Sequence, residues 1–128
     1  MLVPRFPKQQ LIFVVDFANN DAVGWQNLPG WYLGELVAMQ KRLLAFDFNT
    51  VIFAHGIPGD KSTIKRQTEY YENLMSLAKL ALEQGLSEDE AVKTIQSKMS
   101  KYQTWHSYDD WFSLNIRGAY RWAKNNNS

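Results

Sequence analysis

Two apolar runs and the helical pattern between them organise the first half of the chain. Residues 11–15 and 51–54 are continuously apolar and rich in β-branched side chains, a pattern typical of strands that are buried on both faces. Residues 31–46 place apolar side chains at helical spacing. The positions on the common face of this helix are Leu33, Leu36, Val37 and Leu44. These lengths predict a βαβ unit with parallel strands and a right-handed crossover.

The pattern after the second strand predicts three more helices. The first begins at a cap formed by Asp60 or Ser62 and ends just before Gly85, which is suited to a left-handed stop. Residues 87–90 (SEDE) match a capping box at the start of the next helix. Apolar residues at helical spacing predict a last helix over 108–123.

The expected fold class is α/β, with a short sheet and a βαβ unit followed by three C-terminal helices. The Pro-punctuated residues 2–6 predict an additional edge strand. We expect one domain over residues 1–124 and a disordered tail at 125–128. The expected sheet has apolar side chains on both faces. One crossover helix and one C-terminal helical layer would leave it incompletely covered. The pattern therefore predicts a partner chain, a homo-oligomer or poor solubility.

The composition narrows the functional classes. Fourteen Lys and Arg against thirteen Asp and Glu give a formal net charge of +1, which argues against a dedicated binder of nucleic acid or of anionic membranes. No apolar run approaches the length of a membrane span, and the start of the chain lacks the apolar core of a signal peptide. The absence of cysteine excludes thiolate zinc ligands, disulfides and cysteine nucleophiles.

Asp16 and His55 follow the two apolar runs and form the leading candidate site. In parallel α/β sheets, ligands usually bind at the carboxyl ends of the strands, and carboxylate and imidazole groups are good zinc ligands. Two ligands are fewer than a zinc site normally takes from protein. The only other histidine, His106, has no predicted place near them. The alternative is that Asp16 caps its loop through the backbone of Asn19 or Asn20 while His55 makes a local hydrogen bond.

A second candidate is a phosphate-binding loop at residues 55–63 (HGIPGDKST), between a strand and a helix. This segment resembles a Walker A loop, which needs Gly directly before Lys. Asp60 intervenes before Lys61 and places negative charge beside a phosphate, and Pro58 removes one of the amides that cradle it. The pattern favours the first turn of a capped helix.

A third candidate is an aromatic cluster near the end of the sequence. Its members are Tyr102, Trp105, His106, Tyr108, Trp111, Phe112, Tyr120 and Trp122. Such a cluster can form a stacking platform for sugars or bases. Because no basic groove accompanies it, packing of helices on the sheet is the favoured interpretation.

Several segments together resemble the C-terminal half of the metallo-β-lactamase-fold hydrolases. They are LIFVVDF at 11–17, LPG at 28–30, FNTVIFAHG at 48–56 with Gly59-Asp60, EQGLSEDEA at 83–91, and the Trp/Tyr-rich tail with Asn115, Arg117 and Tyr120. Each motif is short, but their order and spacing extend the likeness over essentially the whole chain. The resemblance implies a fold that is half of an αββα sandwich.

The resemblance also implies a metal-dependent hydrolase. In that family the counterpart of Asp16 bridges two metal ions, the counterpart of His55 binds the second, and the reaction is hydrolysis of an ester, amide, thioester or related bond. The family's His-x-His-x-Asp-His stretch belongs to its N-terminal half and does not occur in these 128 residues. We therefore expect a truncated or split hydrolase fragment that is inactive alone and binds Zn only when a partner N-terminal half-domain supplies the missing ligands. The alternative is a non-enzymatic, self-associating interaction module whose homo-oligomer buries the exposed sheet.

Overall fold

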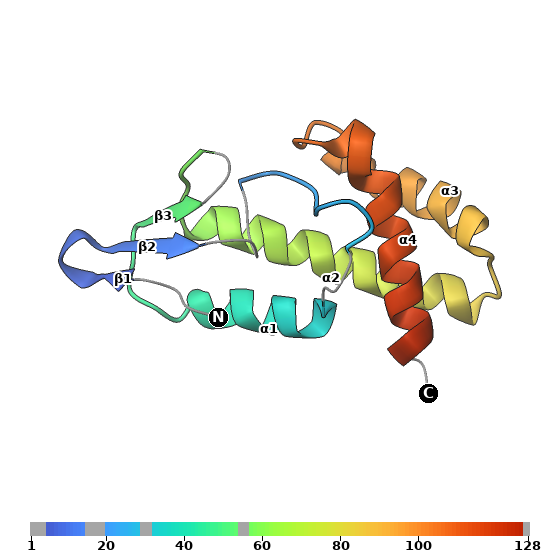
Figure 1. The fold of residues 1–128 in the computed structure, drawn as a ribbon, viewed down its shortest axis with the longest axis horizontal. Coiled ribbons are helices and arrows are strands. Elements are labelled where there is room, and N and C mark those ends of the chain that lie inside the picture. The colour runs from blue at the N-terminus through green and yellow to red at the C-terminus, as the bar shows by residue number, and fades with distance from the viewer. Residues whose placement is uncertain (1–4, 15–19, 29–31, 54–56, 127–128) are drawn as a thin grey trace. The chain divides into compact units, whose positions relative to one another are not determined.

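The computed structural model describes residues 5–14, 20–28, 32–53 and 57–126. Along these residues the chain forms three strands and four α-helices (Figure 1). They are β1 (Arg5–Phe6), β2 (Leu11–Val14), α1 (Leu33–Leu43), β3 (Thr50–Phe53), α2 (Lys61–Glu83), α3 (Glu88–Lys98) and α4 (Tyr108–Asn126), with short 3-10 helices at Pro7–Gln9 and Ser100–Tyr102. The mixed α/β class and the predicted order of strands and helices are confirmed.

The chain divides into two compact units. The sheet unit comprises Met1–Asp21 and Gly34–Tyr70, and the helical unit comprises Ala22–Leu33 and Tyr71–Ser128. The single domain expected over residues 1–124 stays a prediction. Within the described ranges, no helix has both the length and the apolar character that a bilayer crossing requires.

The C-terminal ends of α1 and α4 differ from those expected. α1 ends at Leu43 rather than Phe46, because Ala45 and Phe46 donate their N–H groups to carbonyls three residues earlier, which closes the chain into a turn. α4 extends to Asn126, two residues into the segment expected to be disordered, where the Asn126 side-chain amide donates to the Trp122 carbonyl at 2.8 Å. Helix ends are the least certain part of any sequence-based prediction.

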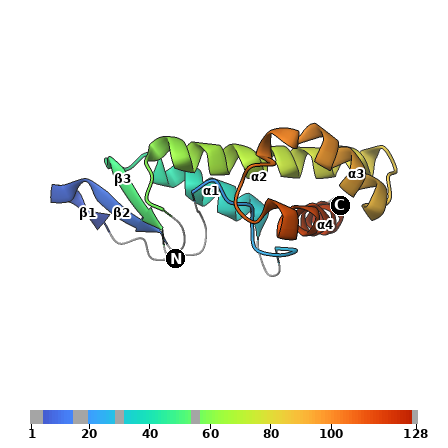
Figure 2. The same ribbon diagram turned by 90° about the horizontal axis from the view of Figure 1, so that it is seen from above.

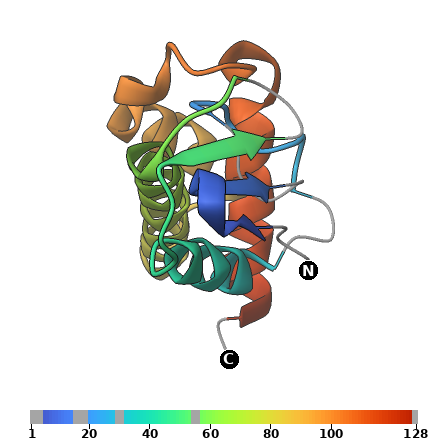
Figure 3. The same ribbon diagram turned by 90° about the vertical axis from the view of Figure 1, so that its left-hand side faces the viewer.

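β2 lies at the centre of the sheet, between β1 and β3 (Figure 3). β2 and β3 pair in parallel, from Leu11 opposite Thr50 to Val14 opposite Phe53. β1 pairs antiparallel with β2. Because α1 connects the two parallel strands, the predicted βαβ unit with parallel strands is confirmed.

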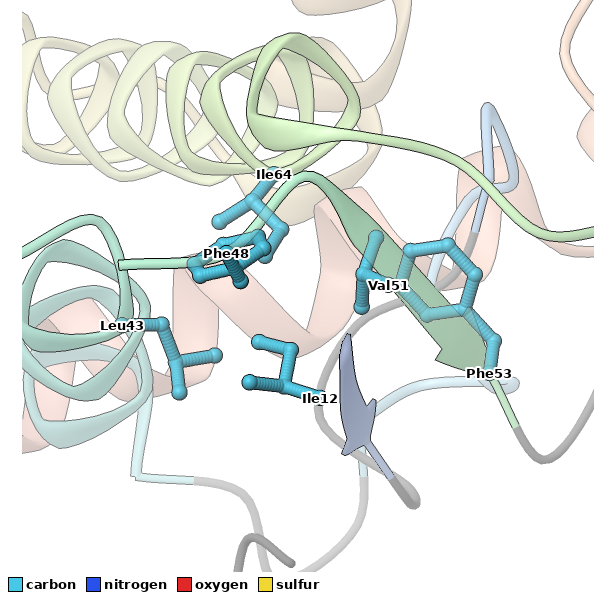
Figure 4. Close-up of a cluster of buried hydrophobic side chains, with 6 residues drawn as sticks. All are labelled: Ile12, Leu43, Phe48, Val51, Phe53 and Ile64. Carbon is cyan, nitrogen blue, oxygen red and sulfur yellow. The ribbon is translucent and has the colours of Figure 1, made fainter. Parts of the chain in front are cut away.

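One face of the sheet carries the core of the sheet unit. Ile12 and Val51 are opposite each other in register, and both are fully buried. Figure 2 shows α1 and the start of α2 on the same side of the strands. The buried cluster between these elements consists of Ile12, Leu43, Phe48, Val51, Phe53 and Ile64 (Figure 4). This burial stabilises the sheet unit by about 25 cal/mol for each Å² of apolar surface removed from water.

The opposite face of the sheet is less buried. Phe13 and Ile52 are opposite each other in register, and both side chains are only partly buried, as is Leu11 on the same face. Successive side chains of a strand point to opposite faces, so these apolar residues lie opposite the core. The difference in burial between the two faces agrees with the incomplete cover expected from the sequence.

The helical unit contains two of the predicted helix signals. Gly85 has a left-handed φ of 73°, and Leu86 donates its N–H to the Ala81 carbonyl at 3.0 Å, which closes α2 as predicted. Ser87 and Glu90 form the predicted capping box, in which the Ser87 hydroxyl accepts from the Glu90 N–H and the Glu90 carboxylate accepts from the Ser87 N–H. Both confirmed signals are local, because each depends on residues within one turn of a helix end.

Ion pairs link α3 to α4 within the helical unit. Arg117 Nη1 lies 2.8 Å from Asp89 Oδ1, and Arg121 Nη2 lies 3.2 Å from Glu88 Oε1. Glu88 Oε1 is buried and makes no hydrogen bond of good geometry, so the neighbouring guanidinium groups supply its charge compensation. The acidic start of α3 is also the end at which the helix dipole favours negative charge.

Candidate functional site

The predicted metal ligands Asp16 and His55 lie outside the described residues. The strands that lead to them are described as far as Val14 and Phe53, which are partners in the parallel register. The chain that follows them is described from Asn20 and Ile57. The structure therefore brings together the two strands from which the predicted ligands come.

The described segments beyond the two predicted ligands also contact each other. The side-chain amide of Asn20 donates to the Pro58 carbonyl at 3.1 Å and to the Ile57 carbonyl at 3.3 Å. Gly59 then returns to the outer edge of β3, where it exchanges two backbone hydrogen bonds of 2.9 Å with Val51. The segments 15–19 and 54–56 are thus each preceded and followed by residues that contact one another.

The described residues contain no group of three His, Asp or Glu side chains that is placed to hold a metal ion. His106 belongs to the helical unit and its side chain is exposed. Its carbonyl accepts the Val23 N–H at 3.1 Å, and it forms a parallel bridge with Ala22. The backbone of His106 therefore connects its own loop to the loop that contains Ala22 and Val23.

The start of α2 has the structure of a capped helix rather than of a phosphate-binding loop. Asp60 Oδ1 accepts the N–H of Ser62 at 2.9 Å and of Thr63 at 3.3 Å, so a carboxylate occupies the position that an anion would take. Lys61 donates to the Leu44 carbonyl at 3.2 Å, and its ammonium group lies 5.1 Å from the centre of the Phe48 ring. These contacts favour the capped-helix interpretation.

The aromatic cluster combines buried rings with half-exposed ones. Tyr102 and Phe112 are buried, the remaining Trp and Tyr side chains are partly buried, and His106 is exposed. Trp105 meets Tyr102 edge-on, and Tyr108 stacks on Phe112, each pair with ring centres 4.6 Å apart. Because these rings pack on each other, the arrangement favours the packing interpretation over a stacking platform.

A buried side chain of α4, Asn115, anchors the loop from Ala22 to Leu28. Asn115 Oδ1 accepts the Gly24 N–H at 2.7 Å. Asn115 Nδ2 donates to the carbonyls of Gly24 at 2.9 Å, Gln26 at 2.7 Å and Trp111 at 3.0 Å. The bonds to Gly24 and Gln26 satisfy backbone groups of the loop in the way that a neighbouring strand would.

The sequence contained a signal for this anchor that the sequence analysis did not use. Phe112, Ile116 and Ala119 define the apolar face of α4, and Asn115 falls on the same face. A polar residue within an apolar stripe is buried and must find hydrogen-bond partners. The pattern alone does not identify the partners, which lie about ninety residues earlier in the chain.

Two glycines allow the loop to approach its neighbours closely. A Cβ atom at Gly24 would lie 2.4 Å from Leu28 Cδ2 and 2.8 Å from the Tyr71 hydroxyl. A Cβ atom at Gly118 of α4 would lie 2.1 Å from the Asn27 carbonyl oxygen. Burial raises the pKa of Tyr71 well above its ordinary value of 10.0, so the hydroxyl at this contact stays protonated.

The backbone of the loop is strained. Gln26 and Leu28 have left-handed φ angles of 47° and 55°, a conformation that costs a residue with a side chain about 1–2 kcal/mol. The side chains of Val23 and Leu28 are buried, and together with Asn115 they hold the loop in this conformation. The loop is therefore fixed by packing and hydrogen bonds rather than by local backbone preference.

No protein-family model matches the sequence, and no curated protein is significantly similar to it. The resemblance to the C-terminal half of the metallo-β-lactamase-fold hydrolases therefore stays a prediction, as do the roles of Asp16 and His55. The structure establishes the mixed α/β class and the parallel β2–β3 pair that both residues follow.

Proposed function

We propose that this chain is the C-terminal half of a metallo-β-lactamase-like hydrolase. Asp16 and His55 each contribute one ligand to a zinc site, and an N-terminal half-domain contributes the others. The chain is inactive in hydrolysis by itself and gains activity when the other half completes the site.

The contacts on both sides of the two ligands carry this proposal. Val14 and Phe53 are register partners, and each stands two residues before a proposed ligand. Two residues of extended chain reach about 7 Å at most, and neighbouring strands lie about 4.8 Å apart. Beyond the two proposed ligands, Asn20 contacts Ile57, which comes two residues after His55. The contacts before and after the two residues support a position of Asp16 close to His55.

The two residues suit zinc in kind but not in number. Carboxylate oxygen and imidazole nitrogen are common zinc ligands, and zinc sites take three or four ligands from protein. The chemistry that the metal supplies in a completed site is activation of water for hydrolysis of an ester, amide or thioester. In this chain, Asp16 and His55 hold and orient the ion, and the requirement for further ligands makes a partner half necessary.

The uneven burial of the sheet is consistent with a partner half. Phe13 and Ile52 face away from the buried cluster and are only partly buried. Parallel strands normally occur in sheets that are covered on both faces. An N-terminal half that packs on this face would bury both side chains and bring its own ligands.

Native mass spectrometry of the purified chain, with and without added zinc, tests the proposal. Because the chain alone supplies only two ligands, we expect it to bind zinc only together with an N-terminal half-domain, and Asp16→Ala or His55→Ala to weaken that binding by about tenfold or more. The matched control is His106→Ala, which removes an exposed imidazole and should leave zinc binding unchanged. Zinc binding that survives both ligand substitutions would overturn the proposed site.

A hydrolysis assay tests whether the chain has activity by itself. We expect the chain alone to leave ester and thioester substrates intact, with or without zinc. Activity in the isolated chain that disappears in His55→Ala would contradict the need for a partner half. Zinc binding and hydrolysis that appear only when an N-terminal half-domain is added are the outcome that supports the proposal.

A non-enzymatic, self-associating module is the second candidate, because the partly buried apolar face of the sheet also suits a second copy. Ile52→Lys would place a charge on this face while leaving the buried cluster intact. A dimer that is indifferent to zinc and is lost in Ile52→Lys would favour this function. Zinc binding that requires an N-terminal half-domain would favour the hydrolase.

A further inference from the structure

Six of the fourteen Lys and Arg side chains lie at one end of the sheet unit, where β2 and β3 begin. They come from the β1–β2 hairpin, the last turn of α1 and the first turns of α2. We call this surface the basic end, and its members are Arg5, Lys8, Lys41, Arg42, Lys61 and Lys65. Two of the thirteen acidic residues, Asp47 and Asp60, lie in or next to the same segments. The formal net charge of +1 therefore conceals an uneven distribution, because the rest of the chain has an acidic excess.

Contacts within the sheet unit join these segments. The Gln10 carbonyl, where the hairpin turn ends, accepts the Asn49 N–H at 2.8 Å. The Arg5 guanidinium lies over the Phe46 ring, 4.5 Å from its centre. Lys61 connects α2 to the turn that follows α1, through a hydrogen bond of 3.2 Å to a backbone carbonyl. The hairpin, the end of α1 and the start of α2 therefore form one continuous surface.

The cations of the basic end lack the acidic partners that the other arginines of the chain have. Arg66, Arg117 and Arg121 each form an ion pair with a carboxylate. Among the residues that the structure describes, five members of the basic end have no carboxylate within ion-pair distance: Arg5, Lys8, Arg42, Lys61 and Lys65. Like charges that gather without partners repel each other and destabilise the fold. The arrangement therefore needs a cause that offsets this repulsion.

The helix dipole offsets the repulsion for only part of the basic end. Lys41 and Arg42 are in the last turn of α1, where a helix favours positive charge. Lys61 and Lys65 are instead among the first five residues of α2, whose first turn has no acidic side chain. The N-terminal end of a helix disfavours positive charge. The α2 cations thus stand where the fold gains least from them, as expected of side chains that serve an external anion.

The hairpin adds an exposed aromatic ring to these charges. The side chains from Arg5 to Gln9 are all exposed, and Phe6, which is 47% exposed, stands between Arg5 and Lys8 in the sequence. An anionic bilayer offers a matching surface, because each Lys or Arg near its headgroups strengthens binding by about fivefold. The boundary between headgroups and acyl chains also accepts apolar side chains.

A nucleic acid fits the basic end less well. Proteins that bind single strands combine a basic groove with aromatic rings on which successive bases stack. The two rings beside the cations are not available for stacking, since Phe46 lies under Arg5 and Phe48 is buried next to Lys61. One exposed ring between cations on a hairpin suits insertion into a lipid surface better than stacking along a strand.

We propose that the basic end binds anionic lipid bilayers, with its cations against the headgroups and Phe6 inserted at the boundary with the acyl chains. The contact is peripheral and uses side chains of the sheet unit. The basic end lies where β2 and β3 begin, whereas the proposed ligands Asp16 and His55 come after the ends of the same strands. The inference therefore needs no zinc and goes beyond the proposed hydrolase.

Co-sedimentation of the full chain with lipid vesicles, in zinc-free buffer of low salt, tests the proposal. We expect binding to vesicles of phosphatidylcholine and phosphatidylserine in equal parts, and none to vesicles of phosphatidylcholine alone. Lys8→Glu combined with Lys65→Glu should lower the partition coefficient by about twentyfold or more. The matched control, Lys93→Glu with Lys98→Glu, replaces two exposed lysines of α3 and changes the net charge by the same amount. Because it lies outside the basic end, it should lower the partition coefficient by about threefold or less.

A second pair of variants tests the inserted ring. Phe6→Ala keeps every cation and should weaken binding to the mixed vesicles by about fivefold. Ile57→Ala removes a side chain that is more exposed, at 71%, but lies outside the basic end. It should bind as the wild-type chain does. Circular dichroism checks that all variants keep their helices.

Four outcomes would overturn the proposal. One is a wild-type chain that does not bind the mixed vesicles, and another is equal binding to both kinds of vesicle. A third is an equal loss in the two charge-reversal pairs, which would assign the attraction to total charge. The fourth is displacement from the vesicles by a single-stranded oligonucleotide while Phe6→Ala binds as wild type, which would make nucleic acid the partner. None of these outcomes bears on zinc binding by Asp16 and His55, so the two proposals fail independently.

Discussion

The side-chain amide of Asn115 pairs with both backbone polar groups of Gly24, ninety-one residues earlier in the chain. Its Oδ1 accepts the Gly24 N–H at 2.7 Å, and its Nδ2 donates to the Gly24 carbonyl at 2.9 Å. The amide thus pairs with the loop in the manner of a neighbouring strand. A single side chain on α4 satisfies backbone groups that would otherwise be buried without partners.

We expect Asn115→Ala to lower the free energy of unfolding by about 2–4 kcal/mol. The substitution leaves the buried N–H and carbonyl of Gly24 and the Gln26 carbonyl without this partner, and each unsatisfied group costs about 1–3 kcal/mol, which local relaxation partly offsets. Urea unfolding followed by circular dichroism measures the change. The matched control, Asn126→Ala, removes an exposed amide with one hydrogen bond and should change stability by about 0.5 kcal/mol or less. Equal losses in both variants would contradict the anchoring role.

Two isoleucines on neighbouring strands test the asymmetry of the sheet. Ile12 is fully buried in the core, whereas Ile52 points to the opposite face and is partly buried. We expect Ile12→Ala to cost about 2–5 kcal/mol, the range for a buried aliphatic side chain, because it leaves a cavity. Ile52→Ala should cost less than half as much in the monomer. Similar losses in urea unfolding would show that both faces are covered to the same extent.

Thr68 and Gln40 form a buried polar contact between α2 and α1. Thr68 Oγ1 lies 3.0 Å from Gln40 Oε1 and 2.9 Å from the Ile64 carbonyl, and both side chains are buried. We expect Thr68→Val to lower the free energy of unfolding by about 1–2 kcal/mol, because it removes the donor and leaves the shape nearly unchanged.

A double-mutant cycle with Gln40→Leu isolates this contact. The double variant should lose less stability than the sum of the two single variants, because the first substitution has already removed the interaction. Additive losses, measured in the same urea titrations, would show that the two side chains contribute independently.

The helix caps predict a loss of stability in acid. A hydrogen bond from the Ser62 hydroxyl lowers the pKa of Asp60 from its ordinary value of 3.8. The Ser87 N–H lowers the pKa of Glu90 from its ordinary value of 4.5. For both carboxyl groups the pKa is lower in the folded chain than in the unfolded chain. Each carboxylate therefore stabilises the fold at pH values above its ordinary pKa. That contribution is lost as the pH falls through the folded pKa.

Urea unfolding at stepped pH values, from about pH 7 to about pH 3, measures this dependence. Asp60→Asn and Glu90→Gln should each flatten the curve of stability against pH in the acid range. Glu69→Gln, which removes an exposed carboxylate from the middle of α2, is the control and should leave the acid slope as it is. An unchanged slope in both cap variants would mean that the caps do not stabilise the fold through their charge.

The sequence by itself determined the elements and their order. The apolar runs that became β2 and β3 and the helical spacing of α1 depend on residues close together in the chain, as do the Gly85 stop and the capping box at Ser87. Local sterics and local hydrogen bonds decide these features, which is why the pattern predicted them. The candidate ligands Asp16 and His55 were also predicted from local sequence, because each is the polar residue that follows a predicted strand.

The tertiary structure alone decided which distant groups meet. The register that places Val14 opposite Phe53, the contact of Asn20 with Pro58, and the anchoring of Gly24 by Asn115 join residues far apart in the sequence. It also decided that Ile12 is buried and Ile52 only partly so, although both belong to continuously apolar runs. Such pairings depend on how the elements pack against each other and on which polar groups hydrogen-bond between them. The periodicity of the sequence does not specify these contacts.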